Sequence, residues 1–174
     1  GGRLDGIIWR VTLDDDGMPL LFDSIHPCGC YHMFFPTERL RAIAAPTKYT
    51  EWAFSPKRLT QRPEAVRLNI TVQTKTHYLA NVAVDMEGAI GDVQSYSLKP
   101  YNELRSIKTA QGFVNLFGLN GIVKGSERGE RFLLWPSGIR SPGAMRQWGR
   151  HATAFVGRRH FDDVDLLDKY YWRR

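Results

Sequence analysis

Residues 7–13 read I-I-W-R-V-T-L, and residues 14–17, D-D-D-G, follow them directly. The first stretch alternates apolar and polar side chains, which is typical of a half-buried strand, and an Asp-Gly pair favours a tight turn. A second apolar run, Leu20 to Ile25, comes directly after the turn. The sequence therefore predicts an opening β-hairpin, with the odd-numbered residues of 7–13 on one face.

The same period of two returns further along the chain. Apolar residues alternate over 66–72 and again over 78–84, with the polar sequence Q-T-K-T at 73–76 between them. This pattern predicts a second β-hairpin. Between the hairpins, residues 34–62 carry Pro36, Pro46 and Pro56, so we expect a long connection there, with one helical turn over 38–44.

The C-terminal part has helical signals instead. Ser141-Pro142 places an N-cap residue before a proline at the first helical position, and apolar residues at helical spacing follow, predicting a helix over 142–156. Asp162 and Asp163 favour a second helix start, because carboxylates are stabilised at the positive N-terminal end of a helix. Gly-rich residues 111–126 are expected to form a surface loop.

Strands early and helices late predict an α+β fold, in which antiparallel hairpins form a sheet packed by two C-terminal helices. The length of 174 residues fits a single α+β domain spanning 1–174. Because the chain starts only a few residues before its first strand, we also expect that it is a fragment of a longer protein.

Composition limits the classes of function. The apolar share of 43% and the charged share of 24% are ordinary for a soluble protein, and no apolar run reaches the ~18 residues of a membrane span. The net charge of +6 favours an anionic ligand, but the basic residues are scattered, so nucleic acid is not expected as a partner. The compartment is left open, cytoplasmic or exported after removal of a signal peptide.

Both cysteines of the chain and two of its five histidines lie within seven residues, as His26-x-Cys28-x-Cys30-x-His32. Thiolate and imidazole are the ligands preferred by zinc and copper, so the leading hypothesis is a transition-metal site at these four residues. In an extended chain the outer histidines would stand about 20 Å apart. A common site therefore requires the backbone to curl, which Pro27 and Gly29 permit.

Fewer ligands from this segment would also suffice, if a distant histidine completes the site. The three histidines outside the segment are His77, His151 and His160. The spacing departs from the C-x₂₋₄-C pairs of structural zinc modules, so the metal interpretation depends on the tertiary structure.

An alternative hypothesis is a cysteine-dependent hydrolase or transferase, with Cys30 or Cys28 as nucleophile. A nearby histidine or positive charge activates a thiol, and His26 and His32 are close in sequence. A partner base can also come from a distant segment. The two candidate pairs are His77 with Asp85 and His151 with Asp163.

Two further interpretations stay open. Cys28 and Cys30 are either bridged or simply buried, with both histidines only hydrogen-bonded. His151 falls at helical spacing from Trp148 and Phe155, which favours a core position. The third functional hypothesis is a basic interaction module that binds an anion.

Overall fold

The structure is a computed structural model that describes residues 6–50, 52–60, 67–85, 94–127, 129–137, 148 and 165–174. Its strands are β1 (Ile8–Leu13), β2 (Pro19–Ile25), β3 (Met33–Pro36), β4 (Leu40–Ala42), β5 (Arg67–Val72), β6 (Leu79–Asp85), β7 (Ile107–Thr109), β8 (Gly112–Val114) and β9 (Tyr171–Arg173). The helical segments are short, namely η1 (Tyr101–Arg105), α1 (Arg131–Leu134), η2 (Trp135–Ser137) and α2 (Leu166–Tyr170).

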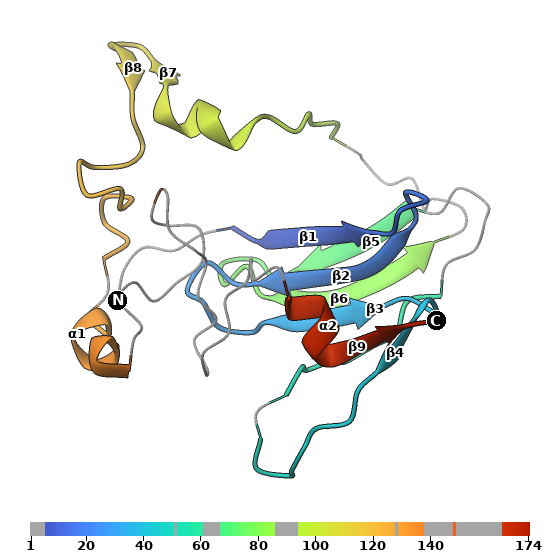
Figure 1. Ribbon diagram of the computed structural model, residues 1–174. Coiled ribbons are helices and arrows are strands. Elements are labelled where there is room, and N and C mark those ends of the chain that lie inside the picture. The colour runs from blue at the N-terminus through green and yellow to red at the C-terminus, as the bar shows by residue number, and fades with distance from the viewer. Residues whose placement is uncertain are drawn as a thin grey trace.

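The central element is an antiparallel sheet with the strand order β1-β2-β3 (Figure 1). The predicted opening hairpin is confirmed, because β1 pairs with β2 from Ile8 opposite Ile25 onward. Gly17 takes a φ of 80° in the connecting turn, and the Asp14 N–H donates to the Met18 carbonyl. This left-handed conformation explains why glycine follows the three aspartates.

The second predicted hairpin is confirmed as β5 and β6, which pair along their whole length. It covers one face of the central sheet, where a buried cluster forms around Phe35, Leu59 and Val82. Phe22 pairs with Phe35 across β2 and β3 and joins this cluster. Directly paired residues of antiparallel strands share a face, so alternate residues of β2 face opposite sides of the sheet.

The opposite face is covered by the C-terminal residues. Phe34 is fully buried there, and its ring lies 5.6 Å from that of Tyr170 and 6.3 Å from that of Tyr171. The whole cluster consists of Leu20, Leu21, Phe34, Leu40, Leu166, Tyr170 and Tyr171. The central sheet is thus the middle layer between β5–β6 and the α2–β9 segment.

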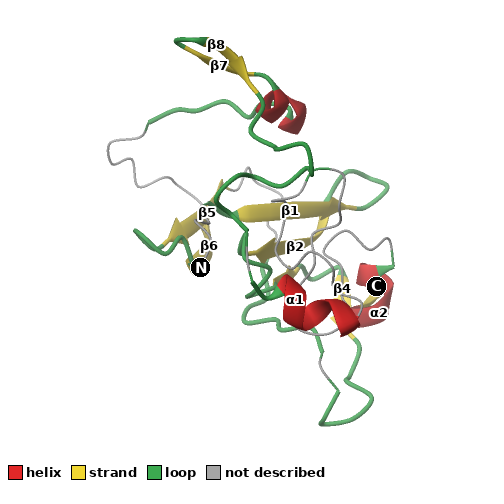
Figure 2. Cartoon of the chain, turned by 90° about the vertical axis from the view of Figure 1, so that its left-hand side faces the viewer, coloured by secondary structure: helices red, strands yellow, loops and turns green. Residues whose placement is uncertain are grey.

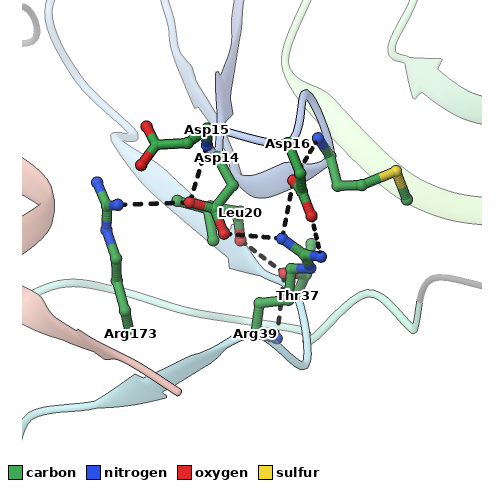
Figure 3. Close-up of polar contacts among 8 residues, drawn as sticks. Asp14, Asp15, Asp16, Leu20, Thr37, Arg39 and Arg173 are labelled. Carbon is green, nitrogen blue, oxygen red and sulfur yellow. Dashed lines mark hydrogen bonds and ion pairs between the residues drawn. The ribbon is translucent and has the colours of Figure 1, made fainter.

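An ionic cluster ties the tip of the first hairpin to β4 and β9 (Figure 3). Arg39 donates to Asp14 at 2.7 Å and also pairs with Asp16, and Arg173 lies 3.4 Å from Asp14. Next to it, the buried Thr37 hydroxyl donates to the Leu20 carbonyl at 2.9 Å. These contacts join segments that are far apart in the sequence, so they stabilise the arrangement of the sheets.

Residues 94–127 and 129–137 form an extended arm that carries η1, β7 and β8. Figures 1 and 2 both show β7 and β8 apart from the other sheets. Tyr101 of the arm stacks on Trp148, which lies outside it in the chain, with ring centroids 5.3 Å apart. Large apolar side chains of the arm that are strongly exposed are Tyr96, Leu98, Phe113, Leu119, Phe132, Leu133 and Trp135.

The predicted α+β fold with one sheet and two C-terminal helices is wrong. The regular elements of the described residues are mainly strands in four small antiparallel sheets, and none of the helical segments there exceeds five residues. The described part of the expected last helix is α2, which ends at Tyr170 because Tyr171–Arg173 leave the helical path and pair as β9 with β4. Its expected start at Asp162 and Asp163 lies outside the described residues. The expected helix over 142–156 falls outside the described residues, Trp148 excepted.

The reason for the error at 171–173 is tertiary. Tyr171 is buried in the core and its backbone pairs with Ala42, so sheet pairing overrides the helical spacing of the apolar residues. The same pairing makes a strand of residues 40–42, where a helical turn was expected. None of the described helices has the length and apolar character that crossing a bilayer requires.

Candidate functional site

The His/Cys segment forms the loop between β2 and β3, and the predicted curl is present. The Gly29 N–H donates to the His26 carbonyl at 2.8 Å, and the His26 N–H donates to the Cys30 carbonyl at 3.0 Å. Gly29 has a φ of 86°. A proline at the first turn position and a left-handed glycine two residues later are typical of a three-residue hairpin loop.

The curl brings one imidazole onto one thiol. His26 Nδ1 lies 2.9 Å from Cys28 Sγ, and the Cys28 backbone N–H donates to the same nitrogen at 3.3 Å. His26 Nε2 lies 3.2 Å from the Thr76 carbonyl oxygen, which can only accept a hydrogen bond. This network assigns the ring proton to Nε2 and leaves Nδ1 as an acceptor that faces the Cys28 thiol.

Thr76 belongs to the turn between β5 and β6, so the second hairpin completes the surroundings of His26. The turn is closed by hydrogen bonds from the Gln73 N–H to the Tyr78 carbonyl and from the His77 N–H to the Gln73 carbonyl. Lys75 and His77 take left-handed conformations with φ of 73° and 54°. The turn therefore presents the Thr76 carbonyl to a loop 50 residues earlier in the chain.

Two tyrosines line the same loop. The ring centroids of Tyr31 and Tyr78 lie 4.7 Å apart, and those of His26 and Tyr78 lie 4.8 Å apart in a T-shaped arrangement. A hydrogen bond with Tyr31 raises the pKa of Tyr78, and the charges of Cys28 and Cys30 raise it further.

His32 belongs to a different group. Its Nε2 donates to Asp23 Oδ2 at 2.9 Å, and its ring packs on Phe34 with centroids 4.3 Å apart. Asp23 also accepts two hydrogen bonds from Arg10, at 2.8 and 3.0 Å. The side chains of Asp23 and His32 are 0% and 1% exposed. This buried network fixes the return of the loop into β3.

The candidate site residues named from the sequence therefore do not gather at one point. His26 and Cys28 are in contact, Cys30 is half-buried two residues further on, and the two cysteines are not bridged. His32 is held in the Asp23 network, and His77 lies in the β5–β6 turn, one residue after Thr76. His151, like His160 and Asp163, falls outside the described residues.

Metal binding and anion binding both stay predictions. In the described part of the chain, no three His, Cys, Asp or Glu side chains gather closely enough to hold a metal ion. Several cationic side chains are engaged within the fold. Arg10 pairs with Asp23, Arg39 with the hairpin tip, and Arg58 donates to two backbone carbonyls.

Sequence reasoning overlooked the groups that orient the loop, namely Arg10, Asp23, Thr76 and Tyr78. Asp23 carried a signal, because a carboxylate within the apolar run 20–25 must be paired if it is buried. Arg10, on the polar side of the opposing strand, was the available partner. The Thr76 carbonyl carried no signal, since any residue offers that group.

Comparison with known proteins finds no matching family model, no similar curated protein and no similar solved structure. A function for this chain therefore has to be inferred from its own residues.

Proposed function

We propose that Cys28 is a nucleophilic thiol activated by His26, in a cysteine-dependent hydrolase or transferase. The single observation that carries this proposal is the 2.9 Å contact between His26 Nδ1 and Cys28 Sγ. A thiolate attacks electrophiles far better than a thiol does, and an adjacent imidazole forms it by accepting the proton.

The Thr76 carbonyl is the third group of the site, after Cys28 and His26, and it orients the His26 ring. It holds the Nε2–H of His26 and so keeps the lone pair of Nδ1 directed at sulfur. After proton transfer, the imidazolium donates one N–H to the Thr76 carbonyl and the other to the Cys28 thiolate. The resulting ion pair is hydrogen-bonded at both ring nitrogens, which favours the reactive form.

The two cysteines differ in burial, so the order of their reaction rates tests the proposal. Cys28 is 8% exposed, whereas Cys30 is half-buried, so access alone would make Cys30 the faster of the two to react. Activation by His26 reverses this order. If burial limits the rate, Cys30 reacts faster than Cys28. If His26 activates Cys28, the order is the opposite.

The experiment is alkylation by iodoacetamide near neutral pH, with each cysteine followed separately by peptide mass spectrometry. We expect Cys28 to react faster than Cys30, and His26→Gln to slow Cys28 by at least about tenfold. Unchanged Cys28 kinetics in His26→Gln would remove the proposal. The pH profile of the wild-type rates gives the same comparison without a substitution.

His77→Asn is the matched control. His77 is one residue from Thr76, and asparagine tolerates the left-handed conformation found there. It should leave the rate at Cys28 unchanged if His26 is the base. A loss of reactivity in this variant and not in His26→Gln would transfer the role of base to His77.

A second candidate function is binding of copper or zinc, and one specific observation favours it. Metal-bound imidazoles usually donate their other ring N–H to a carbonyl or carboxylate, as His26 does to Thr76. The ligands would be His26 Nδ1, Cys28 Sγ and, after a movement of the loop, Cys30 Sγ.

Titration with zinc or copper(I), monitored by calorimetry, tests this candidate. We expect stoichiometric binding that Cys28→Ser abolishes and His77→Asn leaves intact. Bound metal should also protect Cys28 from alkylation. Absence of binding in the reduced wild-type protein would exclude the candidate and leave the nucleophile proposal standing.

A further inference from the structure

The second cysteine of the loop has no part in the reaction of Cys28 with a general electrophile. Cys30 follows Cys28 after a single glycine, in a loop closed by the hydrogen bond from the His26 N–H to the Cys30 carbonyl. The 8% exposed Cys28 and the half-buried Cys30 are both thiols. An activated thiol with a second thiol two residues away is the arrangement needed for thiol–disulfide exchange.

The distance between the two backbones permits a bond between these sulfurs. Two residues apart, the Cα atoms stand at most about 7 Å from one another in an extended chain. The turn at Pro27 and Cys28 and the left-handed Gly29 fold the chain and shorten this separation. Disulfides need Cα atoms about 4.4–6.8 Å apart, and the folding of the loop brings the pair from the extended limit toward this range.

Residues beside both cysteines pack on the same side chain. The His26 ring, which contacts Cys28 Sγ, and the ring of Tyr31, which follows Cys30 directly in the chain, both lie against Tyr78. Both thiols are thus flanked by groups that meet at one tyrosine. Gly29 has no side chain that would separate them. A bridge across so short a loop is strained, and strained disulfides are readily reduced, as catalytic ones are.

We infer that the substrate class of this site is a disulfide, with Cys28 as the attacking thiol and Cys30 as the resolving thiol. This inference rests on the proposed role of Cys28 and His26. It keeps Cys28 as the activated nucleophile and specifies a redox reaction in place of hydrolysis or group transfer, namely the exchange of the protein dithiol with a substrate disulfide.

In the first step, His26 accepts the Cys28 proton and the thiolate attacks one sulfur of the substrate. A Cys28–substrate disulfide forms, the substrate S–S bond breaks, and the departing thiolate takes the proton from His26. In the second step, Cys30 gives its proton to His26 and attacks the Cys28 sulfur. The Cys28–Cys30 bond forms, and the second half of the substrate leaves and takes that proton. The substrate gains two electrons and two protons, and the dithiol loses them.

The experiment exposes the reduced full chain to glutathione disulfide as the probe. Samples are quenched with acid, alkylated with N-ethylmaleimide and analysed by intact mass and peptide mapping. We expect wild type to end as an internal disulfide, lighter by two hydrogens, with two glutathione thiols released per chain. Cys30→Ser should stop at glutathione bound to Cys28, and Cys28→Ser should react at least about tenfold more slowly.

The time course of wild type alone gives a second measurement that needs no variant. Glutathione should appear on Cys28 first and then disappear as the internal disulfide forms. The inference is overturned if glutathione stays attached to wild type as it does to Cys30→Ser. It is also overturned if Cys28 and Cys30 are modified independently at equal rates.

The outcome separates the two proposals. Fast alkylation of Cys28 by iodoacetamide, together with a persistent mixed disulfide, leaves the nucleophile in place and rejects the disulfide substrate. Slow alkylation of Cys28 rejects both. Fast alkylation followed by closure of the internal disulfide supports both.

Discussion

Replacement of Asp23 by asparagine is expected to lower the free energy of unfolding by about 3–5 kcal/mol. The Asp23 carboxylate is fully buried and accepts two hydrogen bonds from Arg10 and one from His32. Hydrogen bonds to charged groups contribute about 1.5–3 kcal/mol each. Their sum is an upper limit, because Arg10 is 29% exposed and regains water when its partner is lost. The rest of the loss in unfolding free energy arises because the His32 imidazole stays buried after its carboxylate partner is removed.

Urea denaturation at neutral pH measures the effect. With a denaturant dependence of about 2 kcal/mol per molar, the midpoint of unfolding should fall by roughly 2 M. Asp15→Asn is the control, since Asp15 is an exposed carboxylate of the same hairpin. We expect little change in that variant. Equal midpoints for the two variants would refute the reasoning that the buried network holds the loop.

Asp23→Asn should also affect the candidate site. His32 leads the chain from the Cys-containing loop into β3, and its bond to Asp23 fixes that end of the loop. In Asp23→Asn, the difference in alkylation rate between Cys28 and Cys30 should therefore diminish under conditions where the protein remains folded. Near-ultraviolet circular dichroism verifies folding in each sample.

Phe34→Ala should lower the free energy of unfolding by about 3–5 kcal/mol in the same denaturation assay, since Phe34 is fully buried between the sheet and the C-terminal residues. Phe113 is 72% exposed, so Phe113→Ala should change this free energy by no more than about 0.5 kcal/mol. Similar losses in the two variants would contradict the placement of the core. The hydrogen bond with Tyr31 raises the folded-state pKa of Tyr78 above its ordinary value of 10.0, so its contribution to stability is fully present below pH 10 and is lost as pH rises through the folded-state pKa. Urea midpoints measured on both sides of pH 10 should accordingly fall less steeply with pH in Tyr78→Phe than in wild type, and identical slopes would exclude this contribution.

Local patterns were sufficient where the interactions are local. Both hairpins follow from the period of two and from residues with the required turn conformations, such as Gly17. Pro27 and Gly29 likewise permit the curl that brings His26 to Cys28. In each case, the backbone preference of a few neighbouring residues specifies the structure, so the sequence contains the necessary information.

The amino-acid sequence by itself thus determined the two hairpins, the turn in the Cys-containing loop and the types of reactive group that it carries. Tertiary structure alone decided that His32 leaves the cluster for Asp23 and that the Thr76 carbonyl orients His26. It also decided that residues 171–173 pair with residues 40–42 in place of a helix. These choices depend on which distant groups compete for burial and hydrogen bonds, and no local period records that competition.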